Sequence, residues 1–296
     1  MAYPPSTSSI LFEIALGKGY FLEEGLAVTP QAFESGKLAL QAMLDGKADL
    51  AISADFPVMA AISGGQPISV AAQVATCRND QAIVARKDRG IAVPADLVGK
   101  TIGVPFGTSS VYFLDSYLSL HGIAHSQVTH KNINASEMSA ALATGTVDAV
   151  CVWNPIFRQL QDEWADRGTV FTSDVLSCDL ACLSGQTAYL ADHPQAIAKF
   201  LKALIRAEAF AKQDPAEGQR IVADSSQIAP KLLAETWASL DLRVSLEQAL
   251  LVSLEDQTRW AQANQIVGGT AMPNYLDYTY FAGLDAVRPE SITIIR

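Results

Sequence analysis

The sequence lacks any run of about 18 apolar residues, so no segment has the length and character of a membrane-spanning helix. It is also poor in basic residues: 21 Lys and Arg stand against 31 Asp and Glu, a net charge of −10. Nucleic acid and anionic membrane surfaces would be repelled over long range, so we expect neither as a partner. A negatively charged small ligand would have to be held by local dipoles.

The N-terminus lacks the charged-then-apolar pattern of a signal peptide. The sequence opens with Met1-Ala2-Tyr3, which has the pattern of the tail of a strand. We therefore expect the natural protein to carry an export or anchor segment ahead of this sequence, and to work in the periplasm or another extracytoplasmic space.

Motifs for metal, redox and nucleotide chemistry are missing as well. The four cysteines have no C-x-x-C spacing and lie in apolar runs, which predicts buried thiols at Cys77, Cys151, Cys178 and Cys182. His121 and His125 have helical i, i+4 spacing, but Gly122 marks a helix end between them, so we expect no metal site. No Walker loop and no Ser-His-Asp ordering stands out. We expect no cofactor and no enzymatic activity.

What the sequence does contain is a regular alternation of apolar strands and amphipathic helices, which predicts an α/β fold with mostly parallel sheets. Its 296 residues, 49% of them hydrophobic, favour two packed lobes over one. Helical patterns dominate after Pro194, and these helices are expected to cover one lobe. The predicted strands are residues 28–33, 48–53, 68–75, 82–85, 101–104, 147–152 and 180–183.

An internal echo supports two similar lobes. Residues 35–57 and 134–155 show the same order of features: a predicted helix, a glycine that ends it, an aspartate, an apolar strand, a polar residue and a proline. Gly46 and Gly145 would end their helices with a positive φ, and Asp55 or Asn154 would cap the next helix. The alternative is a chance match between two ordinary strand-to-helix turns. If the echo is real, lobe 1 is residues 1–86 plus 178–296 and lobe 2 is residues 87–177, with a ligand cleft between them and crossings at 85–88 and 176–179.

In open α/β sheets, ligands bind beyond the carboxyl ends of strands, where loops enter helices. Helix N-termini offer free N–H groups and partial positive charge, and serine or threonine hydroxyls add donors. An oxyanion can therefore be bound without Lys or Arg. The alternative to ligand binding is that Ser109 or Ser110 serves only as the capping residue of its helix. Residues of this kind at strand ends are Ser6, Thr7, Ser35, Gly36, Gly107, Thr108, Ser109 and Ser110.

Four larger side chains complete the candidate ligand set. Trp153 and Asn154 follow a predicted strand, and Trp153 could cover the apolar part of a ligand or simply pack in the core. Asp179 lies beside an apolar strand, where a charge needs a partner, either a ligand ammonium or an arginine. Asp55 competes for that role, although capping already explains it.

Four segments carry a resemblance to the periplasmic binding proteins of sulfonate, nitrate and taurine transporters: FESG (33–36), ADLAIS (48–53), LVGKTIGVPF (97–106) and VDAVCVWNP (147–155). The resemblance implies a two-lobed periplasmic-binding-protein fold with a hinge, and delivery of the ligand to the membrane permease of an ABC importer. Residues 100–122 look most like the taurine-binding branch, and Asp179 falls where that branch has an acid facing the amine. Leu180-Ala181-Cys182 follows instead of the branch's aromatic, which leaves the size or class of the ligand open.

The prediction from the sequence is thus a monomeric solute-binding protein for a small anionic or zwitterionic ligand, a sulfonate or an aminosulfonate such as taurine. The alternatives are a sensory input domain, or a binding protein for nitrate, bicarbonate or a pyrimidine. The cysteine-rich signature of the pyrimidine-biosynthesis relatives of this fold is not reproduced by Cys178 and Cys182, which disfavours an enzyme.

Overall fold

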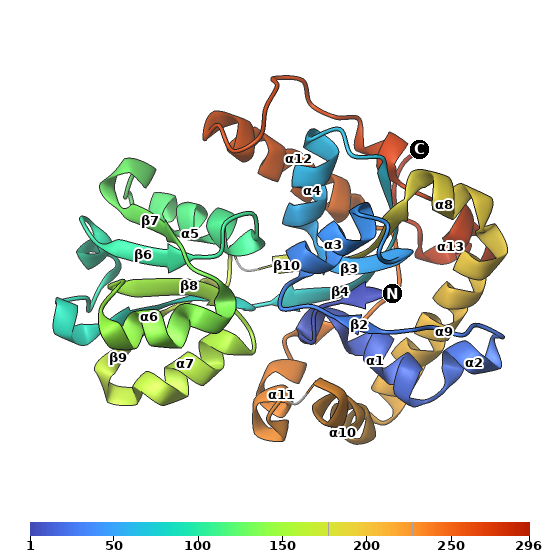
Figure 1. Ribbon diagram of the computed structural model, residues 1–296, viewed down its shortest axis with the longest axis horizontal. Helices are drawn as coiled ribbons and strands as arrows, with labels where there is room; N and C mark the ends of the chain where they lie inside the picture. The colour runs from blue at the N-terminus through green and yellow to red at the C-terminus, as the bar shows by residue number, and fades with distance from the viewer. Residues whose placement is uncertain (177, 227) are drawn as a thin grey trace. The chain divides into compact units, whose positions relative to one another are not determined.

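The computed structural model describes residues 1–176, 178–226 and 228–296. The chain forms two compact units, each built around one sheet (Figure 1). Unit 1 comprises Met1–Cys77 and Leu180–Arg296, and unit 2 comprises Arg78–Asp179. Ser177 and the side chain of Cys178 lie outside the described residues, and with them the prediction of a buried thiol at Cys178 and part of the crossing at 176–179. Among the described helices, none is both long and apolar enough to cross a membrane.

The sheet of unit 1 has six strands in the order β11-β4-β10-β3-β1-β2. β1 pairs in parallel with β2 and β3, whereas β10 runs antiparallel to β3 and β11 antiparallel to β4. The strands are β1 (Ala2–Tyr3), β2 (Gln31–Ala32), β3 (Leu50–Ala54), β4 (Ile68–Arg78), β10 (Cys178–Gln186) and β11 (Leu240–Asp241).

Helices from both ends of the chain cover this sheet, as expected for the helical C-terminal part. Phe12 of α1 is fully buried and contacts Tyr3, Phe21 and Phe200, which joins the first strand and helices to the long helix α9. The α-helices of unit 1 are α1 (Ile10–Gly17), α2 (Tyr20–Glu23), α3 (Gly36–Leu44), α4 (Asp55–Ser63), α8 (Thr187–Asp192), α9 (Pro194–Gln213), α10 (Pro215–Ser226), α11 (Pro230–Trp237), α12 (Gln248–Ala263) and α13 (Ala282–Val287).

Unit 2 has a five-stranded sheet in the order β7-β6-β8-β5-β9. β6 pairs in parallel with β7 and β8, and β5 runs antiparallel to β8 and β9. Its core packs Phe157, Leu160 and Met138 against the buried strand residues Val150 and Val152. The elements are β5 (Gln81–Arg86), β6 (Thr101–Val104), α5 (Ser109–Leu120), the 3-10 turn η4 (His125–Gln127), β7 (Thr129–Asn132), α6 (Met138–Thr144), β8 (Ala149–Trp153), α7 (Ile156–Trp164) and β9 (Gly168–Phe171).

The sheets are mixed, whereas the strand and helix alternation suggested mostly parallel ones. β5 follows the first crossing between the units and β10 contains the second, and each runs antiparallel to its neighbour β8 or β3. A helical crossover inside one sheet is what imposes parallel direction, and these two strands arrive without one. β5 also pairs within unit 2, although residues 81–86 were assigned to lobe 1 from the sequence.

The internal echo corresponds to the same local architecture in both units. α3, β3 and α4 follow one another in unit 1 as α6, β8 and α7 do in unit 2. Gly46 and Gly145 have φ of 72° and 73°, the left-handed conformation predicted for the helix stops. β3 lies between parallel β1 and antiparallel β10, and β8 lies between parallel β6 and antiparallel β5. The predicted repeat is therefore matched in topology as well as in sequence.

The prediction of buried thiols is confirmed for Cys77, Cys151 and Cys182, which are free and buried. Burial raises the pKa of the Cys151 and Cys182 thiols. A thiol with a raised pKa is a poor nucleophile and a poor metal ligand near neutral pH. These cysteines belong to the cores of their units.

Gly36 lets α3 approach β3 more closely than any other residue would. A Cβ at this position would lie 2.8 Å from the Cα of Ser53, which is backbone and cannot rotate away. We expect Gly36→Ala to lower the free energy of unfolding by about 1–3 kcal/mol through overpacking. Urea unfolding measures this, with Gly268→Ala as the control, because nothing lies within 4 Å of that Cβ. Equal stabilities of the two variants would contradict the packing account.

Candidate ligand-binding site

The N-terminus of α5 gathers the hydroxyl donors of unit 2. β6 ends at Val104, and Gly107 turns the chain into the helix with a φ of 77°. Thr108 is the N-cap residue, yet its hydroxyl donates to the carbonyl of Pro105 at 2.7 Å instead of capping. Ser109 and Ser110 are the first two residues of the helix, and both are buried. The alternative that Ser109 or Ser110 is the capping residue is therefore wrong.

The buried amide of Gln81 links these serines to Asp179. Its Nε2 donates to Ser109 Oγ at 3.0 Å and to Asp179 Oδ2 at 2.5 Å, and its Oε1 accepts from Ser110 Oγ at 2.6 Å. Ser109 Oγ also lies 3.3 Å from Asp179 Oδ2. We call Gln81, Ser109, Ser110 and Asp179 the Gln81 cluster. It joins β5, α5 and the start of β10, all within unit 2.

The Gln81 cluster brings together Ser109, Ser110 and Asp179, three of the residues that the sequence singled out. Asp179 is half-buried and accepts hydrogen bonds from Gln81 and Ser109, which are neutral donors. A carboxylate offers several acceptor positions on its two oxygens, so Asp179 could also accept from a cationic group. The serine hydroxyls and the first N–H groups of α5 lie next to it, and these suit an anionic group.

Trp153 and Asn154 lie at the end of β8, beside the Gln81 cluster. Trp153 is the direct partner of Gln81 in the β5–β8 ladder, so the two side chains stand on the same face of the sheet. Trp153 is half-buried and also packs against the core. Asn154 does not cap α7 as predicted: helix α7 starts after the Asn154–Pro155 cis bond, and within the described chain Asn154 Oδ1 is buried without a hydrogen-bond partner.

The candidate residues of unit 1 form separate small networks. Ser6 and Thr7 are buried in the turn after β1, where the Ser6 and Ser8 hydroxyls lie 2.9 Å apart. Ser9 Oγ donates to the carbonyl of Pro4 in the same turn. Ser35 caps α3, because its Oγ accepts from the N–H of Leu38 at 3.3 Å. These hydrogen bonds shape the turns at the carboxyl ends of β1 and β2.

Asp55 has a structural role in addition to its place at the start of α4. It is fully buried, and its carboxylate accepts from Ser253 Oγ at 2.6 Å and from Gln257 Nε2 at 2.9 Å, both on α12. It also accepts from the N–H of Phe56 in the first turn, but Ala54 is the N-cap residue, so the prediction that Asp55 caps this helix is wrong. Burial raises the pKa of Asp55 to about 6. Asp55 thus ties α4 to α12.

The central residue of the cluster, Gln81, was missed by the sequence reasoning. The predicted strand began at Ala82, because periodicity detects apolar residues and Gln81 is polar. A polar residue at the first position of an otherwise apolar strand was the available signal. Its meaning depended on two partners, 28 and 98 residues away in the chain, that only the fold brings near.

Two α/β units with mixed sheets, helices on their faces and polar residues at strand ends define a periplasmic-binding-protein fold. The alkanesulfonate-binding protein of Xanthomonas axonopodis pv. citri, solved with MOPS bound, has this fold with a TM-score of 0.83, at 19% identity over 94% of this chain and 96% of that one. The chain belongs to the NMT1/THI5-like family, whose model matches residues 6–218.

Curated relatives are named binding proteins. The taurine-binding periplasmic protein of Escherichia coli is 31% identical over 141 residues, which cover 48% of this chain and 43% of that protein. The formylaminopyrimidine-binding protein of Halalkalibacterium halodurans is 27% identical over 251 residues, or 83% of this chain and 75% of that protein. The chain spans less than two thirds of the length of the relatives that it matches first.

Proposed function

We propose that this chain is a solute-binding protein that captures a small sulfonate or aminosulfonate, such as taurine, and releases it unchanged. The observation that carries the proposal is the Gln81 cluster, in which hydroxyls at a helix N-terminus lie next to a carboxylate. The first N–H groups of α5 would bind the sulfonate oxygens, and Ser109 and Ser110 would add their hydroxyls by turning from Asp179 and Gln81 toward the ligand. Asp179 would bind the ammonium, at the opposite end of the same small molecule.

Several parts of the proposal draw on the relatives. A taurine-binding protein and an alkanesulfonate-binding protein are among them, and both bind small ligands with a sulfonate group by their names. Delivery to an ABC permease and an extracytoplasmic location belong to the same proposal. The involvement of Ser6, Thr7, Ser35, Gly36 and Asp55 in binding stays a prediction, as does the monomeric state.

Taurine and ethanesulfonate test the two halves of the site separately, because they differ only by the amine. We expect calorimetry to show binding of taurine, and Asp179→Asn to weaken taurine binding at least tenfold while leaving ethanesulfonate binding nearly unchanged. Asp174→Asn is the matched control, since that aspartate is exposed a few residues away. If no sulfonate binds while another small acid binds tightly, the ligand assignment is wrong. Mass spectrometry of the recovered ligand would reveal any turnover.

A pyrimidine is the second candidate ligand, because the formylaminopyrimidine-binding relative aligns over most of this chain. Trp153 offers a flat, half-buried ring on the same face as Gln81, and an amide such as Gln81 or Asn154 can pair with a heterocycle's donors and acceptors. Including an aminopyrimidine in the same calorimetric panel decides between the two. Tighter binding of the aminopyrimidine than of any sulfonate would favour this candidate.

A further inference from the structure

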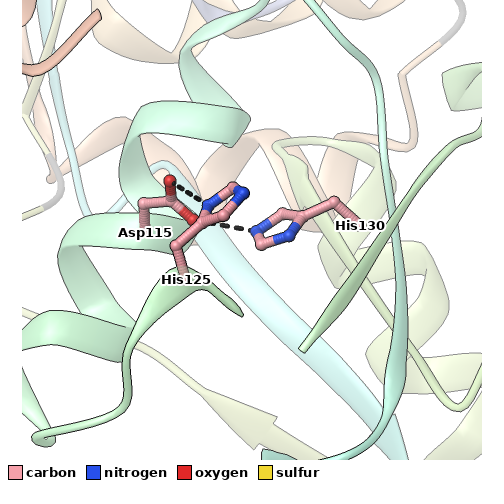
Figure 2. A group of neighbouring side chains, drawn as sticks. All are labelled: Asp115, His125 and His130. Atoms are coloured by element: carbon pink, nitrogen blue, oxygen red, sulfur yellow. Dashed lines mark hydrogen bonds and ion pairs between the residues drawn. The ribbon is translucent and has the colours of Figure 1, made fainter. Parts of the chain in front are cut away.

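Three side chains of unit 2 converge outside the Gln81 cluster. Figure 2 shows Asp115 beside the imidazole rings of His125 and His130, with a dashed line from its carboxylate to each ring. Asp115 Oδ2 lies 2.7 Å from His125 Nδ1, and Asp115 Oδ1 lies 2.8 Å from His130 Nε2. The rings are stacked, with centroids 4.1 Å apart and planes 12° from parallel. α5, η4 and β7 each supply one residue.

The geometry of this group suits a metal ion. One ligand atom from each residue can be chosen so that all three lie within 4.8 Å of one another. Zinc bonds of about 2.0–2.2 Å in a tetrahedron place neighbouring ligand atoms about 3.3 Å apart. The present nitrogen–oxygen distances of 2.7 and 2.8 Å are shorter by about half an ångström. Each distance runs to a different oxygen of Asp115, and rotation of the half-exposed His125 side chain would open the space for an ion.

Burial divides the group into a fixed part and an accessible part. The side chains of Asp115 and His130 are 5% and 8% exposed, whereas that of His125 is 50% exposed. Two ligands are therefore held in place by their surroundings, and the third lies at the surface where an ion can enter. Two imidazoles and one carboxylate are the donor set that favours zinc over magnesium or calcium, which prefer oxygen ligands alone.

We propose that Asp115, His125 and His130 form a zinc site, with water as the fourth ligand. The ion would join α5, η4 and β7, and α5 begins with Ser109 and Ser110. The ion would hold α5, the helix that carries the hydroxyls of the Gln81 cluster, to η4 and β7. It differs from the helical pair considered from the sequence, because His121 packs on the Tyr117 ring at 4.5 Å and His125 pairs with His130 instead.

The test uses the full chain without a polyhistidine tag, stripped with a chelator and titrated with Zn²⁺ alone by calorimetry. We expect one saturable site per chain and a higher thermal unfolding midpoint with zinc. Cobalt(II) in place of zinc is expected to give the visible absorption of a tetrahedral nitrogen–oxygen site. His125→Gln should weaken zinc binding at least tenfold and remove the thermal shift. We expect this variant to fold, because the His125 side chain is half-exposed.

His121→Gln is the matched control, because it replaces a neighbouring histidine that lies outside the cluster. It is expected to bind zinc as the wild type does and to show the same thermal shift. Asp115→Asn gives an independent second variant from the buried side of the site. The proposal fails if the wild type shows no saturable zinc binding, or if His125→Gln and Asp115→Asn bind zinc as tightly as His121→Gln.

Discussion

Replacing Gln81 with leucine is expected to lower the free energy of unfolding of unit 2 by about 3 kcal/mol and to abolish measurable solute binding. The leucine has nearly the same size, so the loss comes from hydrogen bonds. Ser109, Ser110 and Asp179 would each lose a partner in a buried or half-buried place, and an unsatisfied buried polar group costs about 1–3 kcal/mol. The hydroxyls at the start of α5 would also lose the amide that orients them.

Urea unfolding, monitored by hydrogen exchange of α5 and β5, measures the loss of stability. Calorimetry with taurine measures the loss of solute binding. Gln41→Leu is the matched control, because Gln41 is exposed on α3. Among the described hydrogen bonds, its side chain donates only to Asp45, at the end of the same helix. Its effect on stability is expected within about 0.5 kcal/mol. A Gln81→Leu protein as stable as the wild type would show that the cluster does not support the fold of unit 2.

The second large effect is a pH dependence of stability that comes from Asp55. Burial raises the pKa of its carboxyl from 3.8 to about 6, so between these values the folded chain holds a proton that the unfolded chain releases. The contribution of Asp55 to the free energy of unfolding therefore falls as pH rises from about 4 to about 6 and is level above that. A shift of about two pKa units corresponds to about 3 kcal/mol. Asp55→Asn is expected to remove this part of the pH dependence.

Urea unfolding at a series of pH values from about 4 to about 8 tests the expectation, with tryptophan fluorescence as the probe, since one of the four tryptophans, Trp260, packs against Phe56 beside Asp55. Burial also raises the pKa of Glu13 to about 7, so Asp55→Asn should keep a remaining dependence that Glu13→Gln removes. Asp192→Asn, an exposed aspartate of unit 1, serves as the control. Parallel pH profiles for wild type and Asp55→Asn would contradict the assignment.

Much of the fold could be predicted because it depends on local patterns. β6 was placed at its observed residues 101–104, and the helix stops at Gly46 and Gly145 followed from the need for a positive φ. β7 was missed, because Thr129–Asn132 contains only polar residues and no apolar alternation. Its place is determined by parallel pairing with β6, which is a long-range contact.

The candidate site was predicted only in part, for a related reason. Ser109, Ser110 and Asp179 were identified from their positions at strand and helix ends, and the structure brings them together. Gln81, which connects them, was not. Asp55 was recognised at a helix start, but its partners Ser253 and Gln257 lie about 200 residues further along the chain.

The sequence by itself determined the alternation of strands and helices, the repeated helix–strand–helix unit and the supply of uncharged donors at strand ends, because propensity, periodicity and glycine stops act over a few residues. Only the tertiary structure decided which polar groups became partners: Gln81 with Asp179, Asp55 with Ser253, and Asp115 with two histidines. Those pairings depend on strand order and helix packing, which bring distant residues within hydrogen-bonding reach.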